Sequence, residues 1–403
     1  NINSGDAKLI YSESINFDKT VDGGWLDVLD PTGAGNNTLT VRGGGTVNGA
    51  STRCSAAKNK FESLTINVSG SGSTLNADCH LDAADLIVSD GGKIQNVKNT
   101  NATIKVDSSA GNSASLLENV DGDIDVYAPV RYISGSSGEF TLHAGASELD
   151  LNSRAHSDVT VNLLAGSVRR GSPKSIDAQA GTIDSINGST TVVKKGAGTT
   201  IVSNSSYSGA TSVREGTLKA AAASAFSASS DTTVEGGATL DLGGTTQSIN
   251  KLTVKGSESK VENGTLVNRD LTNEGQINLT GIQQSNGTIT NSGTITLDAG
   301  SLKATRVVNS GNLTAAGTAE VENLVNSGNA TFNDFEGTSR SGYSIESPGN
   351  LTVSGDLSSV GTVYLKGNAT GTVSGNVDVK NLYIGGLPSD EVVPSGTTRF
   401  DVS

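Results

Sequence analysis

The fold is decided by four short segments in the second half of the chain: TNEG at 272–275, TNSG at 290–293, VNSG at 308–311 and VNSG at 325–328. Their glycines lie 18, 18 and 17 residues apart. A stretch of alternating apolar and polar residues follows each segment: QINL at 276–279, TITL at 294–297, NLT at 312–314 and NATF at 329–332. A turn and a strand that recur at a fixed period predict a solenoid, whose functional surfaces lie along a face or in loops.

The composition fits a chain of many short strands. Of 403 residues, 51 are Gly, while hydrophobic content is 34% and aromatic content 4%. Low hydrophobicity is also typical of disorder. Here, however, Val, Ile and Leu recur throughout and alternate with Ser, Thr, Asn and Asp, which predicts an all-β protein. Residues 218–225 are the one stretch that favours a helix, because their interior is mostly Ala.

The charge excludes one class of partner. A net charge of −13 argues against nucleic-acid binding, which needs a basic face. It favours solubility and repulsion between copies. No stretch is long and apolar enough to span a membrane as a helix. The sequence starts at Asn1 and contains no Met, so we expect a processed or trimmed fragment, whose start says nothing about secretion.

A distinctive three-part pattern occupies residues 193–243. It consists of VKKGAGT at 193–199, YSGATSVREGTL at 207–218 and VEGGATLDL at 234–242. This order resembles the passenger-associated transport repeat of bacterial autotransporters: K-x-G-x-G-T, then Y-x-G-x-T-x-V-x-x-G-T-L, then V-x-x-G-A-T-L-x-L. The chain departs from the repeat at Thr200-Ile201, where the family prefers Leu. It also continues for about 160 residues beyond the repeat.

The resemblance implies a secreted passenger of the AIDA-type adhesin class. Such a passenger folds as a right-handed three-stranded parallel β-helix, a solenoid with protruding loops. It is exported across the outer membrane through a C-terminal barrel that this fragment lacks, and acts outside the cell or on the bacterial surface.

We expect a single β-helix domain over residues 1–403. Its expected parts are capping rungs at 1–50, a less regular region with loops at 129–180, the transport repeat at 193–243 and regular rungs at 265–385. Trp25, the only Trp, is expected to cover the exposed first rung; stacking on a ligand is the alternative.

The two cysteines, Cys54 and Cys79, leave three possibilities open. A disulfide between them would contribute about 3 kcal/mol if unstrained and would fit an exported protein. Free thiols are the second possibility. Zinc bound together with His80 is the third, although this set offers only three donors. We favour the disulfide and expect no metal site.

Catalysis is the next question, because parallel β-helices also include pectin-degrading enzymes. The best carboxylate cluster is DGDID at 121–125. It lacks the later Glu of a calcium loop, and its Asp residues more simply occupy outward strand positions. The Gly-Asp-Ser-Gly motif of serine-protease passengers does not occur in the sequence. We therefore expect no enzyme, no catalytic residues and no cofactor; a polysaccharide lyase or hydrolase is the remaining alternative.

Basic residues gather in one part of this acidic chain. Because Arg donates a bidentate fork to sulfates and carboxylates, these residues predict a site for sulfated glycosaminoglycans. The alternative is that they keep loops soluble or pair with Asp150, Asp158 and Asp177. The predicted glycan-binding residues are His143, Arg154, His156, Arg169, Arg170, Lys174, Lys194 and Lys195.

The recurring Asn residues have two interpretations. Stacked Asn side chains commonly hydrogen-bond along the axis of a solenoid and stabilise its corners. Alternatively, they form a polar face for an extended matrix protein such as fibronectin, bound by β-strand addition, or for self-association that aggregates cells into biofilm. The predicted face comprises Asp270, Asn273, Asn291, Asp298, Asn309 and Asn326.

Overall fold

The computed structural model describes residues 6–10, 18–22, 25–29, 37–49, 60–80, 82–98, 103–107, 113–135, 137–145, 147–284, 287–298, 300–339, 343–366, 369–385 and 399–402. Throughout these ranges the regular structure is β-strand, and the strands that have partners pair in parallel. Within the same ranges there is no helix that could cross a membrane. The all-β parallel solenoid predicted from the sequence is therefore confirmed.

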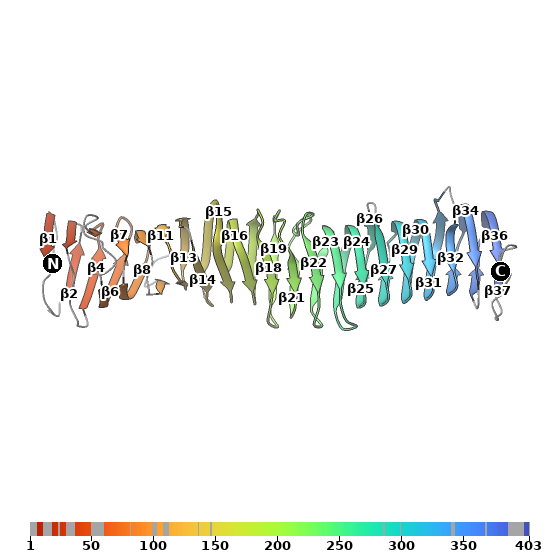
Figure 1. The fold of residues 1–403 in the computed structure, drawn as a ribbon, viewed down its shortest axis with the longest axis horizontal. Coiled ribbons are helices and arrows are strands. Elements are labelled where there is room, and N and C mark those ends of the chain that lie inside the picture. Colours follow the sequence, from red (N-terminus) through yellow and green to blue (C-terminus); the bar gives the residue numbers. More distant parts are fainter. Residues whose placement is uncertain are drawn as a thin grey trace. The chain divides into compact units, whose positions relative to one another are not determined.

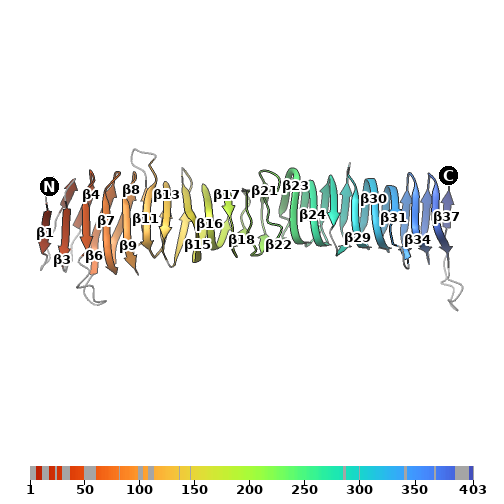
Figure 2. The same ribbon diagram turned by 90° about the horizontal axis from the view of Figure 1, so that it is seen from above.

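The chain divides into two compact units, Asn1–Val192 and Val193–Ser403. Figures 1 and 2 show that strands lie side by side in chain order within each unit. The strands of unit 1 are β1 (Asp6–Ile10), β2 (Asp18–Asp22), β3 (Trp25–Leu29), β4 (Asn37–Arg42), β5 (Thr46–Gly49), β6 (Lys60–Ser69), β7 (Thr74–His80), β8 (Asp82–Ser89), β9 (Lys93–Lys98), β10 (Ile104–Asp107), β11 (Ser115–Val120), β12 (Ile124–Val126), β13 (Pro129–Ser134), β14 (Gly138–Leu142), β15 (Glu148–Leu163), β16 (Ser167–Ala178) and β17 (Gly181–Ile186).

Strand β18 (Thr191–Lys194) spans the boundary between the units. The strands of unit 2 are β19 (Thr199–Ser203), β20 (Thr211–Val213), β21 (Thr217–Ala220), β22 (Asp231–Val234), β23 (Thr239–Val254), β24 (Lys260–Asn273), β25 (Gln276–Leu279), β26 (Gly281–Gln284), β27 (Thr288–Asn291), β28 (Thr294–Leu297), β29 (Leu302–Asn309), β30 (Asn312–Asn326), β31 (Asn329–Gly337), β32 (Tyr343–Ser347), β33 (Asn350–Val353), β34 (Leu357–Leu365), β35 (Thr370–Val373), β36 (Val377–Ile384) and β37 (Arg399–Val402).

One column in the core of unit 1 consists of identical side chains. Val41, Val68, Val88, Val106 and Val126 are successive register partners on β4, β6, β8, β10 and β12. All five are buried. Because side chains alternate between the two faces of a strand, the intervening polar residues point outward. The β-branched Val suits such a pleated surface. The alternation in the sequence therefore places these valines on top of one another inside the solenoid.

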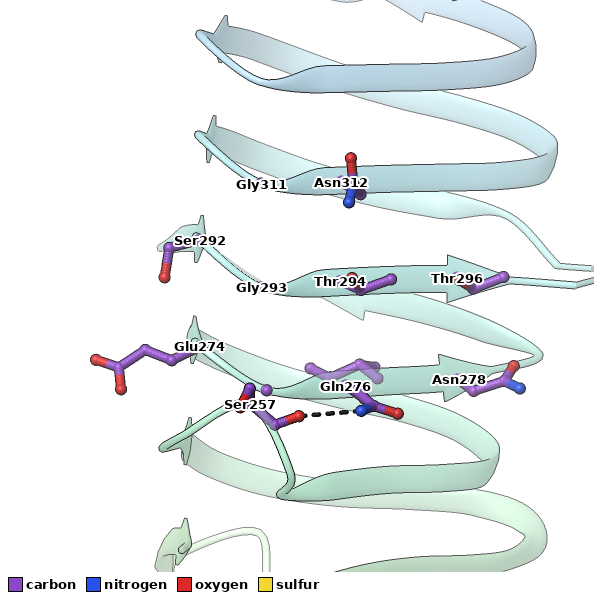
Figure 3. Close-up of a pocket in the computed structure, with 12 residues that line it drawn as sticks. Ser257, Glu274, Gln276, Asn278, Ser292, Gly293, Thr294, Thr296, Gly311 and Asn312 are labelled. Atoms are coloured by element: carbon purple, nitrogen blue, oxygen red, sulfur yellow. Dashed lines mark hydrogen bonds between the residues drawn. The ribbon is translucent and has the colours of Figure 1, made fainter. Parts of the chain in front are cut away.

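Three parallel ladders of strands build the regular part of unit 2. In the first, Ile277, Ile295 and Leu313 are register partners. The second ladder pairs β24 with β26 and then β29. The third pairs β24 with β27 and then β29. The chain visits the ladders in turn, so each turn of the solenoid contains three strands here, and Figure 3 shows successive turns stacked in this way.

Two stretches singled out in the sequence, 129–180 and 218–225, have the following structure. The described part of 129–180 consists mainly of strands with short connections, including the long β15 and β16. The period breaks because β15 bends at Asn152 and Ser153, which have positive φ, and its register shifts there. Residues 218–225 form the end of β21 followed by turns, because the strand register continues from β19.

Two expectations concern the N-terminal part. Trp25 lies on β3, which pairs with β1 on one side and β5 on the other, so it does not occupy the outermost strand. Cys54 lies outside the described residues, and so does the predicted disulfide with Cys79.

Candidate functional site

The four recurring Asn residues form a buried ladder inside one corner of unit 2. Asn273 Nδ2 donates to Asn291 Oδ1 at 2.7 Å, Asn291 to Asn309 at 2.7 Å, and Asn309 to Asn326 at 2.8 Å. All four side chains are 0% exposed. The axial ladder is therefore present. The assignment of these four residues to a protein-binding face is wrong, because no partner can reach them.

Glycine is required next to this ladder for reasons of space. A Cβ on Gly293 would lie 2.2 Å from the carbonyl oxygen of Gly275, and one on Gly311 would lie 2.1 Å from that of Gly293. Both distances are far below any normal contact. The Asn-x-Gly segments thus place an amide inside the corner and leave the next turn room to stack.

The outward side of the first ladder carries two rows of uncharged polar residues. Residues one and three positions after each corner glycine point outward, because strand side chains alternate. One row is Asn278, Thr296, Thr314, Thr331, Thr352 and Thr372, and the other is Gln276, Thr294, Asn312, Asn329 and Asn350. We call these two rows the outer face. Outward Thr and Asn of the strands beside the recurring Asn residues are expected on a polar face, but the six residues predicted by name do not include these two rows.

Amide groups on the outer face also hydrogen-bond from turn to turn. Asn329 Nδ2 donates to Asn312 Oδ1 at 2.9 Å, and Asn350 Nδ2 donates to Asn329 Oδ1 at 2.8 Å. These three Asn residues are exposed. The outer face therefore repeats the chemistry of the buried ladder where a partner can reach it.

A pocket of about 530 Å³ opens at one end of the outer face. In Figure 3, Glu274 and Ser292 extend from one side of the corner, whereas Thr294 and Asn312 lie on the strands that follow it. The complete lining is Ser257, Glu274, Gly275, Gln276, Ile277, Asn278, Ser292, Gly293, Thr294, Thr296, Gly311 and Asn312.

The two Asp residues assigned to the binding face lie apart from it. Asp270 is on β24, where it accepts a hydrogen bond from the Thr288 amide at 3.2 Å and pairs with Arg269 at 2.9 Å. These contacts lower the pKa of Asp270, the backbone hydrogen bond being the larger cause. Asp298 is exposed beyond the end of β28. The two belong to different ladders, so the six predicted residues do not form one surface.

Two arginines of the predicted basic site have acidic partners. Arg169 pairs with Glu148 at 2.6 Å, and Arg170 binds Asp150, whose side chain is only 6% exposed. Burial by itself raises the pKa of Asp150, but hydrogen bonds from Arg170 and the Asn152 amide outweigh it and lower the pKa.

Charges alternate along the ladder that contains this pair. Arg131, Asp150, Arg169 and Asp184 are successive register partners. Opposite charges on neighbouring strands stabilise a sheet. The alternative interpretation, in which the arginines pair with Asp150, is therefore observed for Arg170, while Arg169 pairs with Glu148 and lies 3.7 Å from Asp150.

The histidines of the predicted site also have structural partners. His143 Nε2 lies 2.8 Å from Asp125 Oδ1, and its ring stacks on Tyr127 at 4.2 Å. His156 is buried, with Nε2 3.1 Å from the carbonyl oxygen of Leu151. Burial lowers the pKa of His156. His156 is therefore excluded from a surface site.

The remaining basic residues divide between surface and interior. Arg154, Lys174 and Lys195 are exposed. Lys194 is 0% exposed, so its assignment to a glycan site is wrong. Lys194 and Lys195 also belong to unit 2, whereas the other six predicted residues belong to unit 1.

Several polar residues of the transport-repeat pattern are internal. Lys194 Nζ donates to the carbonyl oxygens of Lys195 at 2.7 Å, Gly196 and Glu215 at 3.1 Å. The Tyr207 hydroxyl bonds Thr211 Oγ1 at 2.9 Å, which in turn lies 3.0 Å from Ser230 Oγ. Burial raises the pKa of Tyr207 to about 12. Buried polar groups need such partners, so this pattern encodes an internal hydrogen-bond network.

Comparison with known protein families gives a match over residues 192–220 to the family described as passenger-associated-transport-repeat. No curated protein and no solved structure matches the chain. The matched segment contains Lys194, Tyr207 and Thr211. Together with the parallel β-solenoid, it supports an autotransporter passenger.

The described residues contain no group of three or more His, Cys, Asp or Glu side chains that could hold a metal ion. Asp123 and Asp125 flank Ile124, whose side chain is buried, which is the outward placement expected of them.

Proposed function

We propose that this chain is an autotransporter passenger, exported to the bacterial cell surface, where it acts as an AIDA-type adhesin for the host extracellular matrix. The transport repeat at 192–220 supports the export. The observation that carries the adhesive role is the outer face of unit 2, where uncharged hydroxyl and amide groups repeat in register over successive turns.

The outer face suits an extended partner more than a compact one. Hydroxyls donate and accept, and each amide offers two donors and one acceptor. A single hydrogen bond contributes only about 1 kcal/mol net, but a repeated row engages many at once. Several passengers on one cell then raise the combined strength. A fibronectin-like matrix protein is the proposed partner for this face.

Sulfated glycosaminoglycans are the second proposed matrix ligand. The support for this ligand class is that several basic side chains of unit 1 are exposed to solvent. Arg154 and Lys174 are exposed, and the side chains of Arg169 and Arg170 are 41% and 46% exposed despite their acidic partners. Because exposed charges are screened by salt, binding through them weakens as ionic strength rises.

Adhesion of cells that display the chain tests the proposal. Thr314→Glu with Thr331→Glu introduces two carboxylates into the outer face. Thr272→Glu with Thr290→Glu is the matched control, because these two residues are also register partners with outward side chains, on the third ladder. We expect the first pair to reduce adhesion to fibronectin and the second to leave it unchanged. Equal adhesion of the parent chain and both variants to fibronectin would contradict the proposed role of the outer face.

Self-association between passengers is the second candidate, and the uncharged outer face favours it. A net charge of −13 keeps copies apart elsewhere, whereas two such rows present identical periods and complementary groups. Sedimentation at high micromolar concentration tests it: dimers that disappear in the Thr314→Glu, Thr331→Glu variant support it, and a monomer of the parent chain counts against it.

A further inference from the structure

We propose that the pocket at the Gly275, Gly293 and Gly311 corner binds a neutral, β-linked glycan through its hydroxyl groups. The inference rests on the proposed binding role of the outer face and names the ligand class of one site on it. Four observations carry it: the shape of the pocket, its unpartnered polar groups, its charge, and the spacing of the turns.

The corner residues contribute only backbone to the lining of the pocket. Three successive corner residues are glycines, so backbone alone forms that part of the lining. Glycine permits close approach of a ligand to the main chain. The volume of about 530 Å³ falls within the range of about 300–1,000 Å³ usual for small-molecule sites.

Several polar groups of the lining have no protein partner. Three side chains of the lining make no hydrogen bond within the described part of the chain: the carboxamide of Asn278 and the hydroxyls of Thr294 and Thr296. Asn312 accepts from Asn329 through Oδ1, and its Nδ2 has no acceptor among the described residues. These groups can donate and accept. A sugar, whose adjacent hydroxyls also do both, matches them.

The charge of the pocket excludes the acidic glycans proposed for unit 1. Glu274 is the only ionisable residue in the lining, and no cation is present there. Its carboxylate accepts a hydrogen bond from the backbone N–H of Gly256 at 3.4 Å. A sulfate or uronate would meet this negative charge without an Arg or Lys to compensate it. A strongly apolar ligand is also disfavoured, because Ile277, the one large apolar residue of the lining, is only 1% exposed.

The spacing favours a linear chain of sugars. Successive turns lie about 4.8 Å apart, which is close to the advance of one pyranose unit along an extended β-linked glycan. Thr294 and Asn312 are register partners on adjacent turns. Neighbouring sugar units can therefore meet equivalent groups, one turn after the next.

Calorimetric titration of the whole chain with cellotriose and chitotriose tests the proposal. Thr294→Val with Thr296→Val removes two pocket hydroxyls while keeping the side-chain shape and β preference. Thr331→Val with Thr352→Val is the matched control, since these residues lie on the outer face but do not line the pocket. We expect one of the trisaccharides to bind, the pocket variant to bind it about tenfold more weakly, and the control to match the parent chain.

Three results would overturn the proposal: no heat with either trisaccharide, equal weakening in both variants, or tighter binding of a sulfated heparin trisaccharide at this pocket. Circular dichroism melts establish that both variants fold. Adhesion to fibronectin by the displayed chain without trisaccharide binding would reject this inference alone. Trisaccharide binding without matrix adhesion would reject the proposed adhesin role and keep the pocket.

Discussion

Removing one amide from the buried Asn ladder should destabilise unit 2 far more than removing one from the outer face. Asn291→Ala is the perturbation, and Asn329→Ala is its control. Both side chains take part in amide-to-amide hydrogen bonds of similar length, 2.7 Å and 2.9 Å. They differ in environment, because Asn291 is 0% exposed and Asn329 is exposed.

The magnitude follows from the groups left behind. Asn291 Nδ2 donates to Asn309 Oδ1 at 2.7 Å and to the Asn312 carbonyl at 2.9 Å, and its Oδ1 accepts from Asn273 at 2.7 Å. Leaving a buried polar group without its partner costs about 1–3 kcal/mol. We expect Asn291→Ala to lower the free energy of unfolding by about 3 kcal/mol. The outer-face control should stay within about 0.5 kcal/mol, as surface substitutions do.

Urea unfolding followed by circular dichroism measures both changes. A double-mutant cycle with Asn309→Ala isolates the shared bond, because the double variant loses it only once. We expect a coupling of about 1 kcal/mol, with the double variant less destabilised than the sum of the singles. Equal costs for Asn291→Ala and Asn329→Ala, or strict additivity of the buried pair, would refute this explanation of the ladder.

Three further predictions concern the buried ionisable residues Lys194, His156 and Asp150. Lys194→Met leaves three carbonyls without their ammonium donor and should lower the free energy of unfolding in urea by about 2 kcal/mol; a neutral change would mean that water replaces the ammonium group. Burial lowers the pKa of His156 from its usual 6.5, so the unfolded chain binds its proton first on acidification and stability falls below about pH 6.5. His156→Phe should flatten that part of the melting temperature against pH, and an unchanged slope would assign it to other groups. Arg169→Ala with Arg170→Ala should lower the melting temperature at pH 7, because Asp150 loses its partners and its pKa rises. The difference from the parent should shrink at pH 3, because the stability from a lowered carboxyl pKa is complete above the ordinary value of 3.8 and is lost as the pH falls through the lowered pKa; a constant difference would contradict the role of Asp150.

Much of the fold could be predicted from local patterns. Glycines spaced by 18, 18 and 17 residues predict stacked turns, because each turn must return to the same place to bury its apolar side chains. Alternation along each strand predicts which side chains face inward. The transport-repeat pattern was equally readable, because its Lys, Tyr, Gly and Thr residues recur at fixed distances along one segment.

The residues of the candidate site are brought together by contacts between turns. The spacing of residues along the chain does not determine which residues meet in those contacts. Asn291 and Asn312 both look like polar surface residues, yet Asn291, before the Gly293 corner, is buried, whereas Asn312, after the Gly311 corner, is exposed. Arg170 and Asp150 are 20 residues apart and meet only because β15 and β16 pair in one particular register. Strand alternation is a local property of the backbone, whereas partners on the next turn are set by register and corner geometry. For that reason the solenoid was predictable from the sequence, and so was the Asn ladder as one of two interpretations. The choice between those interpretations, the partners of the basic residues and the extent of the outer face required the tertiary structure.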